Sequence, residues 1–284
     1  MSQKEAFQSR IREFPITTDN IIVKPNWISD VPGEFTEPEI LDWLLELYPD
    51  KNIYIVESYS LWRIPRDIRK NPDLGLGIDL IEGKEFQGLY EQRDQEYLER
   101  TGNREILDQH GVRYVNVTEA FWNNECIDPK IIADLTDEAS IKWKELFGYV
   151  PQELFDIRGN STFVSLAKVK TQPQLPQIYI SMATKNLFGL IPHPSCVPNF
   201  HKDDNAHIGQ VVHDMHQIYT SIFPEQLWIA EGVKTMVRNY RSDDQQVEED
   251  KGLLFAGKDA KEVDSEACRS VGIDPNDVPH LQLL

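Results

Sequence analysis

Short apolar runs that are rich in β-branched residues recur along the chain, and each run ends in charged or small residues. The runs cover residues 20–24, 52–57, 112–117, 162–169, 226–230 and 252–256. A continuous apolar run of about four to eight residues is typical of a strand that is buried on both faces of a sheet. We therefore predict six strands at these positions.

Segments with helical periodicity lie between these runs. In the first, Thr36 is the predicted N-cap, Pro38 falls in the first turn and Glu39 has the capping-box spacing. Further helices are predicted over residues 85–100, 130–147 and 204–222, and another opens at Asp259. Alternating strands and helices predict an α/β fold, with a mostly parallel, Rossmann-like sheet and helices on both faces.

The domain organisation follows from the same pattern. We expect residues 1–19 to form an N-terminal extension and residues 20–284 to form a single α/β domain, with loop insertions near residues 61–84 and 240–251. The first loop carries Arg63, Arg66, Arg69 and Lys70. It is either a lid that brings positive charge over an anion or a solvated insertion, and we favour the second interpretation slightly. The second loop is acidic and is expected to be exposed.

The composition of the chain argues against several classes of binding partner and cofactor. The net charge is -18 and no basic run is present, which disfavours a nucleic-acid partner or an anionic membrane surface. Three well-separated cysteines (126, 196 and 268) make an iron–sulfur cluster or structural zinc held by this chain alone improbable. No NAD or ATP motif is found. We expect a cytoplasmic protein without a membrane span. The sequence is compatible with a homo-oligomer.

The residues that follow the predicted strands are mostly charged. In a parallel sheet, ligands bind beyond the carboxyl ends of the strands. Ordinary polar loop residues would explain any one strand end, but the coincidence over five of them favours a ligand site. The residues in question are Lys24, Asn26, Glu57, Ser58, Lys170, Thr171, Glu231 and Asp259.

The densest group of polar side chains lies between residues 168 and 189. Lys168, Lys170 and Thr171 end one predicted strand, and Thr184, Lys185 and Asn186 follow a short distance on. A lysine ammonium is a point charge that suits a carboxylate or a phosphate, and a partly desolvated lysine can also act as a general base or form a Schiff base. The alternative is a strand edge whose lysines simply reach solvent.

Five of the seven histidines lie between residues 193 and 216. On a helix over residues 204–222, His213 would face solvent, and His207 and Asp214 would share one flank, where Asp214 could orient His207. A metal site through His213 and His216 is a less favoured alternative. His193 lies in a rigid loop between two prolines and is a site candidate, whereas His280 is a weaker one.

Several of these segments together match a known pattern. Lys24-Pro25-Asn26 follows the first strand, Lys168-Val-Lys170-Thr171 ends the fourth, and Lys185-Asn186-Leu187-Phe188-Gly189 follows Thr184. Gly257-Lys-Asp259 with Asp264, Gly272-Ile-Asp-Pro and Pro279-His280-Leu281 complete the match. From about residue 20 to residue 284, the chain resembles the domain-of-unknown-function family 362.

The resemblance names no reaction. Many members of that family carry ferredoxin-like cysteine modules, and this chain has none of those motifs. Gln172 stands where the family pattern has a histidine, so acid–base chemistry is not expected at that position.

The favoured hypothesis is an enzyme that acts on a small anionic metabolite, a carboxylate or phosphate, by isomerase- or lyase-type acid–base chemistry in biosynthesis. The expected catalytic residues are Lys170, Lys185 and His207. The expected substrate-binding residues are Lys24, Asn26, Lys168, Thr171, Thr184, Asn186, His193 and Asp214. The residues expected to balance charge or to bind a divalent metal are Glu57, Glu231, Asp259 and Asp264. A non-catalytic accessory protein for a ligand or metallocofactor and a redox enzyme with a separate electron carrier are the alternatives.

Overall fold

The computed structural model describes residues 1–63, 84–171, 180–193, 200, 206–238 and 246–284. Arg66, Arg69, Lys70, Gln172 and Cys196 therefore lie outside the described residues. A seven-stranded sheet has the order β3-β2-β1-β4-β6-β7, and a short β5 pairs with β4. The strands are β1 (Asn20–Pro25), β2 (Asn52–Glu57), β3 (Arg113–Asn116), β4 (Ser161–Thr171), β5 (Ile180–Ser181), β6 (Glu225–Arg238) and β7 (Gln246–Gly257).

The first five strands in this order are parallel, and β5 and β7 run antiparallel to their neighbours. The predicted α/β fold with a mostly parallel sheet is thus confirmed. All six predicted strands are present, and β5 is an addition that no apolar run indicates. The loop predicted near residues 240–251 is wrong from Gln246 onward, because residues 246–251 belong to β7.

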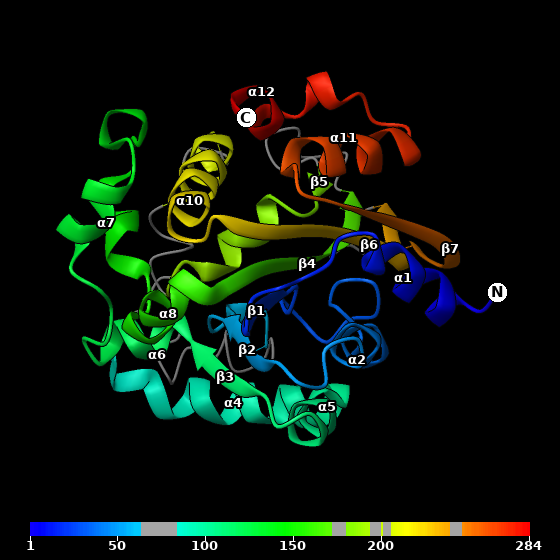
Figure 1. Ribbon diagram of the computed structural model, residues 1–284, viewed down its shortest axis with the longest axis horizontal. Helices are drawn as coiled ribbons and strands as arrows, with labels where there is room; N and C mark the ends of the chain where they lie inside the picture. Colours follow the sequence, from blue (N-terminus) through cyan, green and yellow to red (C-terminus); the bar gives the residue numbers. More distant parts are fainter. Residues whose placement is uncertain (64–83, 172–179, 194–199, 201–205, 239–245) are drawn as a thin grey trace, which may run out of the picture.

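Helices cover the sheet on both faces (Figure 1). The α-helices are α1 (Gln3–Arg12), α2 (Pro38–Leu45), α4 (Gln87–Thr101), α5 (Asn103–Gln109), α6 (Val117–Trp122), α7 (Pro129–Leu135), α8 (Gln152–Ile157), α10 (Ile208–Ile222), α11 (Ala260–Ser270) and α12 (Pro279–Leu283). The 3-10 helices are η1 (Leu61–Arg63), η3 (Lys84–Phe86), η4 (Glu138–Ser140), η5 (Lys144–Tyr149), η6 (Arg158–Asn160), η8 (Lys185–Leu190) and η10 (Pro275–Asp277).

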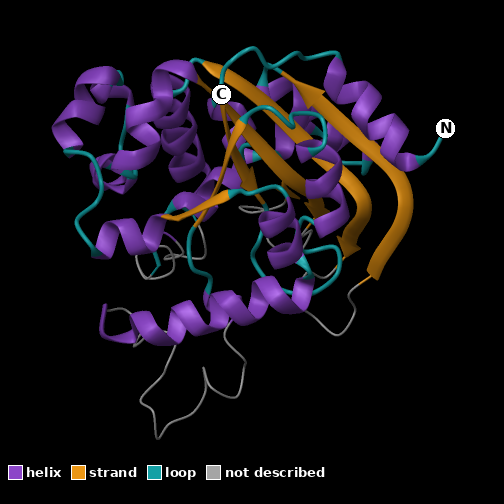
Figure 2. Ribbon diagram, turned by 60° about the horizontal axis from the view of Figure 1, so that its bottom comes forward, coloured by secondary structure: helices purple, strands orange, loops and turns teal. Residues whose placement is uncertain are grey.

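Among the described residues, two large hydrophobic clusters form most of the core, one on each face of the sheet, and Tyr59 and Tyr90 form a small third cluster. Successive side chains of a strand point to opposite faces, so Ile22 joins the cluster under α10 and Val23 joins the cluster under α2. The second cluster also takes up Phe7 and Ile11 of α1, and this helix lies beside the outer strand β7 (Figure 2). The N-terminal extension therefore packs as part of the domain.

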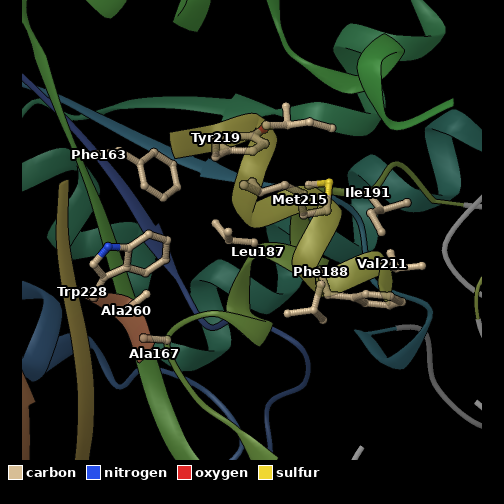
Figure 3. Close-up of a cluster of buried hydrophobic side chains, with 14 of the residues drawn as sticks. Phe163, Ala167, Leu187, Phe188, Ile191, Val211, Met215, Tyr219, Trp228 and Ala260 are labelled. Atoms are coloured by element: carbon tan, nitrogen blue, oxygen red, sulfur yellow. The ribbon is translucent and has the colours of Figure 1, made fainter. Parts of the chain in front are cut away.

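Helix α10 has the apolar face that its sequence predicts, although it begins at Ile208 and not at residue 204. Its side chains Val211, Met215 and Tyr219 face the sheet in the larger cluster (Figure 3). The predicted helix over residues 130–147 is wrong, because α7 ends at Leu135. The backbone beyond it turns so that the N–H groups of residues 142 and 143 can donate to the buried carboxylate of Asp214.

The predicted N-cap role of Thr36 is also wrong. Helix α2 begins at Pro38, and its N-cap residue Glu37 makes no side-chain cap. The buried Thr36 hydroxyl instead accepts the Asn26 N–H (2.9 Å) and donates to the Leu166 carbonyl (3.1 Å). This hydroxyl therefore joins the chain beyond β1 to β4, which is a tertiary role that local sequence cannot reveal.

We expect Thr36→Val to lower the free energy of unfolding by about 1–3 kcal/mol, because the buried Asn26 N–H and Leu166 carbonyl each lose a partner. Thr36→Ser keeps the hydroxyl and should cost no more than about 1 kcal/mol for the lost methyl group. Urea unfolding of both variants measures the difference. Equal losses in the two variants would contradict the role assigned to the hydroxyl.

Candidate functional site

The strand order places a topological switch point between β1 and β4. From β1 the chain builds β2 and β3 on one side, and it then returns to place β4 on the other side of β1. Ligands of open α/β sheets bind at the carboxyl ends of the strands that flank such a point. Lys24 and Asn26 lie at that end of β1, and Lys168 and Lys170 lie at that end of β4. The sheet thus brings these four residues together; we call them, with their polar partners, the strand-end cluster.

A buried ion pair between β1 and β2 forms the first part of the cluster. Lys24 Nζ lies 2.5 Å from Glu57 Oε1 and 2.7 Å from the Pro25 carbonyl oxygen, and the two side chains are 1% and 4% exposed. Burial lowers the pKa of Lys24, and the Glu57 carboxylate opposes that effect. Glu57 also accepts the N–H groups of Trp27 (3.1 Å) and Ser58 (2.9 Å). Its role here is to balance the charge of the lysine.

Arg63 extends this ion pair toward α4. Its guanidinium pairs with Asp94, donates to the Trp27 carbonyl and lies 3.7 Å from Glu57 Oε2. It also lies 4.6 Å from the centre of the Tyr97 ring, in cation–π geometry. Arg63 is therefore buried, and neither interpretation of the arginine-rich loop, lid or solvated insertion, applies to this residue. Asp94 was not among the predicted site residues, since an aspartate within a polar helix carries no signal.

Two asparagine amides connect the two faces of the sheet. By strand alternation, Lys24 faces the α10 side, and Lys168 and Lys170 face the α2 side. Lys170 Nζ donates to Asn26 Oδ1 (2.5 Å) and to the Glu34 carbonyl (2.8 Å). Asn26 Nδ2 donates to Asn186 Oδ1 (3.1 Å), which also lies 3.3 Å from Lys24 Nζ. Asn26 therefore links Lys170 and Lys24 around the end of β1.

Asn186 completes this link on the α10 side. Its Nδ2 donates to the Lys24 carbonyl (2.8 Å) and to Ser165 Oγ (3.1 Å). The neighbouring Leu187 and Phe188 insert into the hydrophobic cluster beside α10 (Figure 3). Apolar anchoring of η8 thus fixes the amide in place. Ser165 was not among the predicted site residues, because a serine inside an apolar strand is an ordinary feature of the sequence.

Lys168 lies in a second buried ionic group. Its ammonium is 2.7 Å from Glu231 Oε1 and also pairs with Glu37, and its side chain is 0% exposed. Burial alone would lower the pKa of Lys168, but the two carboxylates outweigh burial and raise it. Burial raises the pKa of Glu231, although Lys168 pulls it down. Glu231 therefore balances the charge of a lysine, as Glu57 does.

Asp264 holds the turn that leads into η8. Its carboxylate accepts the N–H groups of Ala183 (2.7 Å) and Thr184 (2.9 Å) and the Thr184 hydroxyl. Burial raises the pKa of Asp264 to about 6. Thr184 and Asp264 thus fix the backbone from which Lys185 and Asn186 project. Thr171 is buried at the end of β4, where it pairs with Ile180 of β5.

The remaining predicted catalytic residues lie on the α10 side. Lys185 is half-buried at the start of η8, and His207 is half-buried just before α10, with its ring 5.4 Å from that of Trp143. His193, a predicted binding residue, is also buried, and its ring lies 5.1 Å from that of Tyr90 in α4. Burial lowers the pKa of His193 to about 4.

Two further predicted site residues, Asp214 and Asp259, have structural roles outside the strand-end cluster. Asp214 accepts the N–H groups of residues 142 and 143 and the Gln210 amide, and His213 Nδ1 lies 3.2 Å from it. In the described part of the chain, Asp214 therefore holds the segment after α7 in place and does not orient His207. Asp259 is exposed and caps α11 by accepting the Glu262 N–H (2.9 Å).

Metal-ligating side chains do not gather in one place within the described part of the chain. Among the described residues, no group of three or more histidine, cysteine, aspartate or glutamate side chains is arranged to hold an ion. Burial raises the pKa of the Cys126 and Cys268 thiols to about 12. Among the described helices, none is both long and apolar enough to cross a membrane.

The order of the strands and the lysines beside the switch point define a Rossmann-like α/β protein with a polar strand-end cluster. The sequence model of one family, described as "Domain of unknown function (DUF362)", matches residues 21–269, and the chain belongs to this family. No curated protein and no solved structure matches the chain significantly.

Gly189 allows the Lys24–Glu57 pair to lie against the backbone. A Cβ atom at this position would lie 2.7 Å from Lys24 Nζ and 3.0 Å from Lys24 Cε. Because the ammonium is buried and held by Glu57, Gly189→Ala should lower the free energy of unfolding by about 1–3 kcal/mol. Gly88→Ala is the matched control, since no atom lies within 4 Å of the added methyl group. Equal free energies of unfolding for the two variants, measured with a chemical denaturant, would contradict this close packing.

His193 should contribute to acid sensitivity. Its pKa is about 4 in the folded protein and 6.5 in the reference state, so the stability it contributes is present above pH 6.5 and lost as the pH falls toward 4. In His193→Gln, we expect the slope of unfolding free energy against pH in this window to fall by up to about 1.4 kcal/mol per pH unit. Denaturant titrations at several pH values measure the slope, and an unchanged slope would refute the assignment.

Proposed function

We propose that the protein is an enzyme that binds a small anionic metabolite, a carboxylate or phosphate, at the carboxyl ends of β1 and β4. The observation that supports this proposal best is the place of Lys170 beside the switch point, where the amide of Asn26 holds its ammonium. A lysine held in this way is a point charge with a fixed position, which suits an anionic group.

The two ionic groups support the proposal by making the strand ends rigid. Lys24 is paired with Glu57, and Lys168 is paired with Glu231 and Glu37. These lysines therefore serve to hold β1, β2, β4 and β6 together at the switch point, and less to attract a ligand. A protein side chain that its surroundings already hold in place loses little conformational entropy when a ligand binds to it.

The proposed chemistry is proton transfer, which isomerases and lyases share. Lys170, Lys185 and His207 are the candidates for the group that carries the proton, because each has a titratable nitrogen: Lys170 lies at the end of β4, Lys185 begins η8, and His207 precedes α10, the helix that packs against η8. We further propose a cytoplasmic location, which the sparse cysteines support.

A non-catalytic ligand-binding protein is the second candidate. It is favoured by the mutual hydrogen bonding of Lys24, Asn26 and Asn186, which are buried and bind one another. Such a network is a stable platform for binding and supplies no reactive group itself. Turnover separates the two functions. A variant of the proton-transfer residue of an enzyme loses turnover and keeps its affinity within a few-fold, whereas a binding protein has no turnover to lose.

The ligand can be identified by mass spectrometry of small molecules that copurify with the protein, together with metal analysis of the same sample. Lys170→Met should weaken binding of the identified anion by about tenfold or more, equivalent to about 1.4 kcal/mol. Lys258→Met is the control, because Lys258 is exposed and lies near Glu225 at the opposite end of β6. If calorimetry shows that the Lys170 variant binds every candidate anion as tightly as the wild type, the proposed site is wrong.

A further inference from the structure

Helix α7 exposes two large apolar side chains on one face. Ile131 is 42% exposed and Leu135 is 46% exposed, and the two lie four residues apart, which places them one turn apart on the same side of the helix. Phe121 of α6 is 37% exposed, and its ring lies 5.2 Å from that of Tyr149 in η5, which packs against α7. Among the described residues, six large apolar side chains are comparably exposed, and three of them lie between residues 121 and 135. Apolar side chains that gather on a surface mark interaction sites, whereas single ones do not.

The inner face of α7 is anchored in the core. Ile132 is fully buried in the larger hydrophobic cluster, and the helix packs against η5 and α10. Figure 1 shows α7 at the outer edge of the molecule, on the side away from β7. The core therefore fixes the helix from which Ile131 and Leu135 project. Binding to a surface that is fixed in this way orders few protein groups, so it costs little conformational entropy.

Carboxylates surround the exposed apolar face. Asp128 and Asp134 are exposed, and each lies three residues from Ile131, so the two flank it on opposite sides. Among the described residues, Glu138 pairs with Lys144 (3.3 Å), and the other acidic side chains of this segment have no basic partner. Between residues 125 and 138, the exposed acidic residues are Glu125, Asp128, Asp134, Asp137 and Glu138, and the exposed basic residue is Lys130.

The charge of this surface selects among the molecules that could cover it. A second copy of the chain would bring the same carboxylates face to face, and like charges across an interface disfavour association. An anionic membrane surface is disfavoured for the same reason. A basic partner gains from charge complementarity, which also speeds its encounter with a chain of net charge -18.

We propose that Phe121, Ile131, Leu135 and the carboxylates around them form a docking surface for a basic segment of another protein. The partner segment is an amphipathic helix whose apolar side chains cover Ile131 and Leu135, with lysines and arginines that meet Asp128 and Asp134. An apolar centre within a charged rim is the usual anatomy of such an interface. The docking surface does not rest on the proposed anion site and goes beyond it.

The docking surface can be tested on the intact protein with a synthetic amphipathic helix made of leucine and lysine. Calorimetry measures its affinity for the wild type and for Ile131→Ser/Leu135→Ser, which should bind the peptide about tenfold or more weakly. Leu283→Ser is the matched control, because Leu283 is 44% exposed in α12, and its variant should bind within about twofold of the wild type. Equal affinities of the wild type and the Ile131→Ser/Leu135→Ser variant overturn the proposal.

A second pair of variants tests the charged rim without changing an apolar residue. Asp128→Asn/Asp134→Asn should weaken binding of the lysine peptide by several-fold and reduce the loss of affinity on adding salt, because fewer exposed charges are left to screen. Asparagine can still cap α7, as Asp128 does by accepting the Lys130 N–H (2.9 Å). Asp50→Asn/Glu105→Gln removes two exposed charges elsewhere and is the control for net charge alone. If both double variants lose the same affinity, the attraction is not specific to α7 and the proposal fails.

Two further measurements identify the class of partner. A peptide with glutamate in place of every lysine should not bind, and binding as tight as that of the lysine peptide would contradict a basic partner. Analytical ultracentrifugation tests a second copy as the occupant. A wild-type dimer that dissociates in Ile131→Ser/Leu135→Ser would show that this face joins two copies of the chain, which overturns the proposed basic partner.

Discussion

The buried ion pair between Lys24 and Glu57 is the interaction on which the rest of the strand-end cluster depends. Removing two charges from water costs several kcal/mol per ion, and the attraction between them offsets this cost only when additional hydrogen bonds complete the shell. The surroundings of the pair meet that condition. Backbone N–H groups of Trp27 and Ser58 bind the carboxylate, and the Pro25 carbonyl binds the ammonium. Gly189 leaves room for the ammonium to reach them.

The pair also connects parts of the chain that are distant in sequence. Glu57 lies at the end of β2, Lys24 near the end of β1, and Asn186 in η8 lies 3.3 Å from the lysine ammonium. Through Asn26, the same network reaches Lys170 on the other face of the sheet. Displacement of any one of these side chains would leave a buried polar or charged group without a partner. The network therefore favours a single arrangement of the strand ends.

Much of the fold could be predicted from hydrophobic periodicity. The six apolar runs form strands in the structure. The apolar face of α10 could be predicted because its apolar residues follow the helical period within one segment. The predicted helix over residues 130–147 ends early at Leu135, and the backbone N–H groups of residues 142 and 143 bind Asp214, some 70 residues further along the chain. Thr36 had the spacing of a cap, yet its hydroxyl binds groups that only the packed sheet brings near.

The sequence by itself determined which strand ends are polar and which of them carry lysines, because the end of each apolar run can be located along the chain. Only the tertiary structure decided what those lysines do. Lys24 and Lys168 meet carboxylates from other elements, and Lys170 donates to Asn26 and to the Glu34 carbonyl. Arg63, Asp94 and Glu37, which pair with these groups, were not among the predicted site residues. Their roles arise from burial, which makes every charge require a specific neighbour, and that neighbour is fixed by the fold.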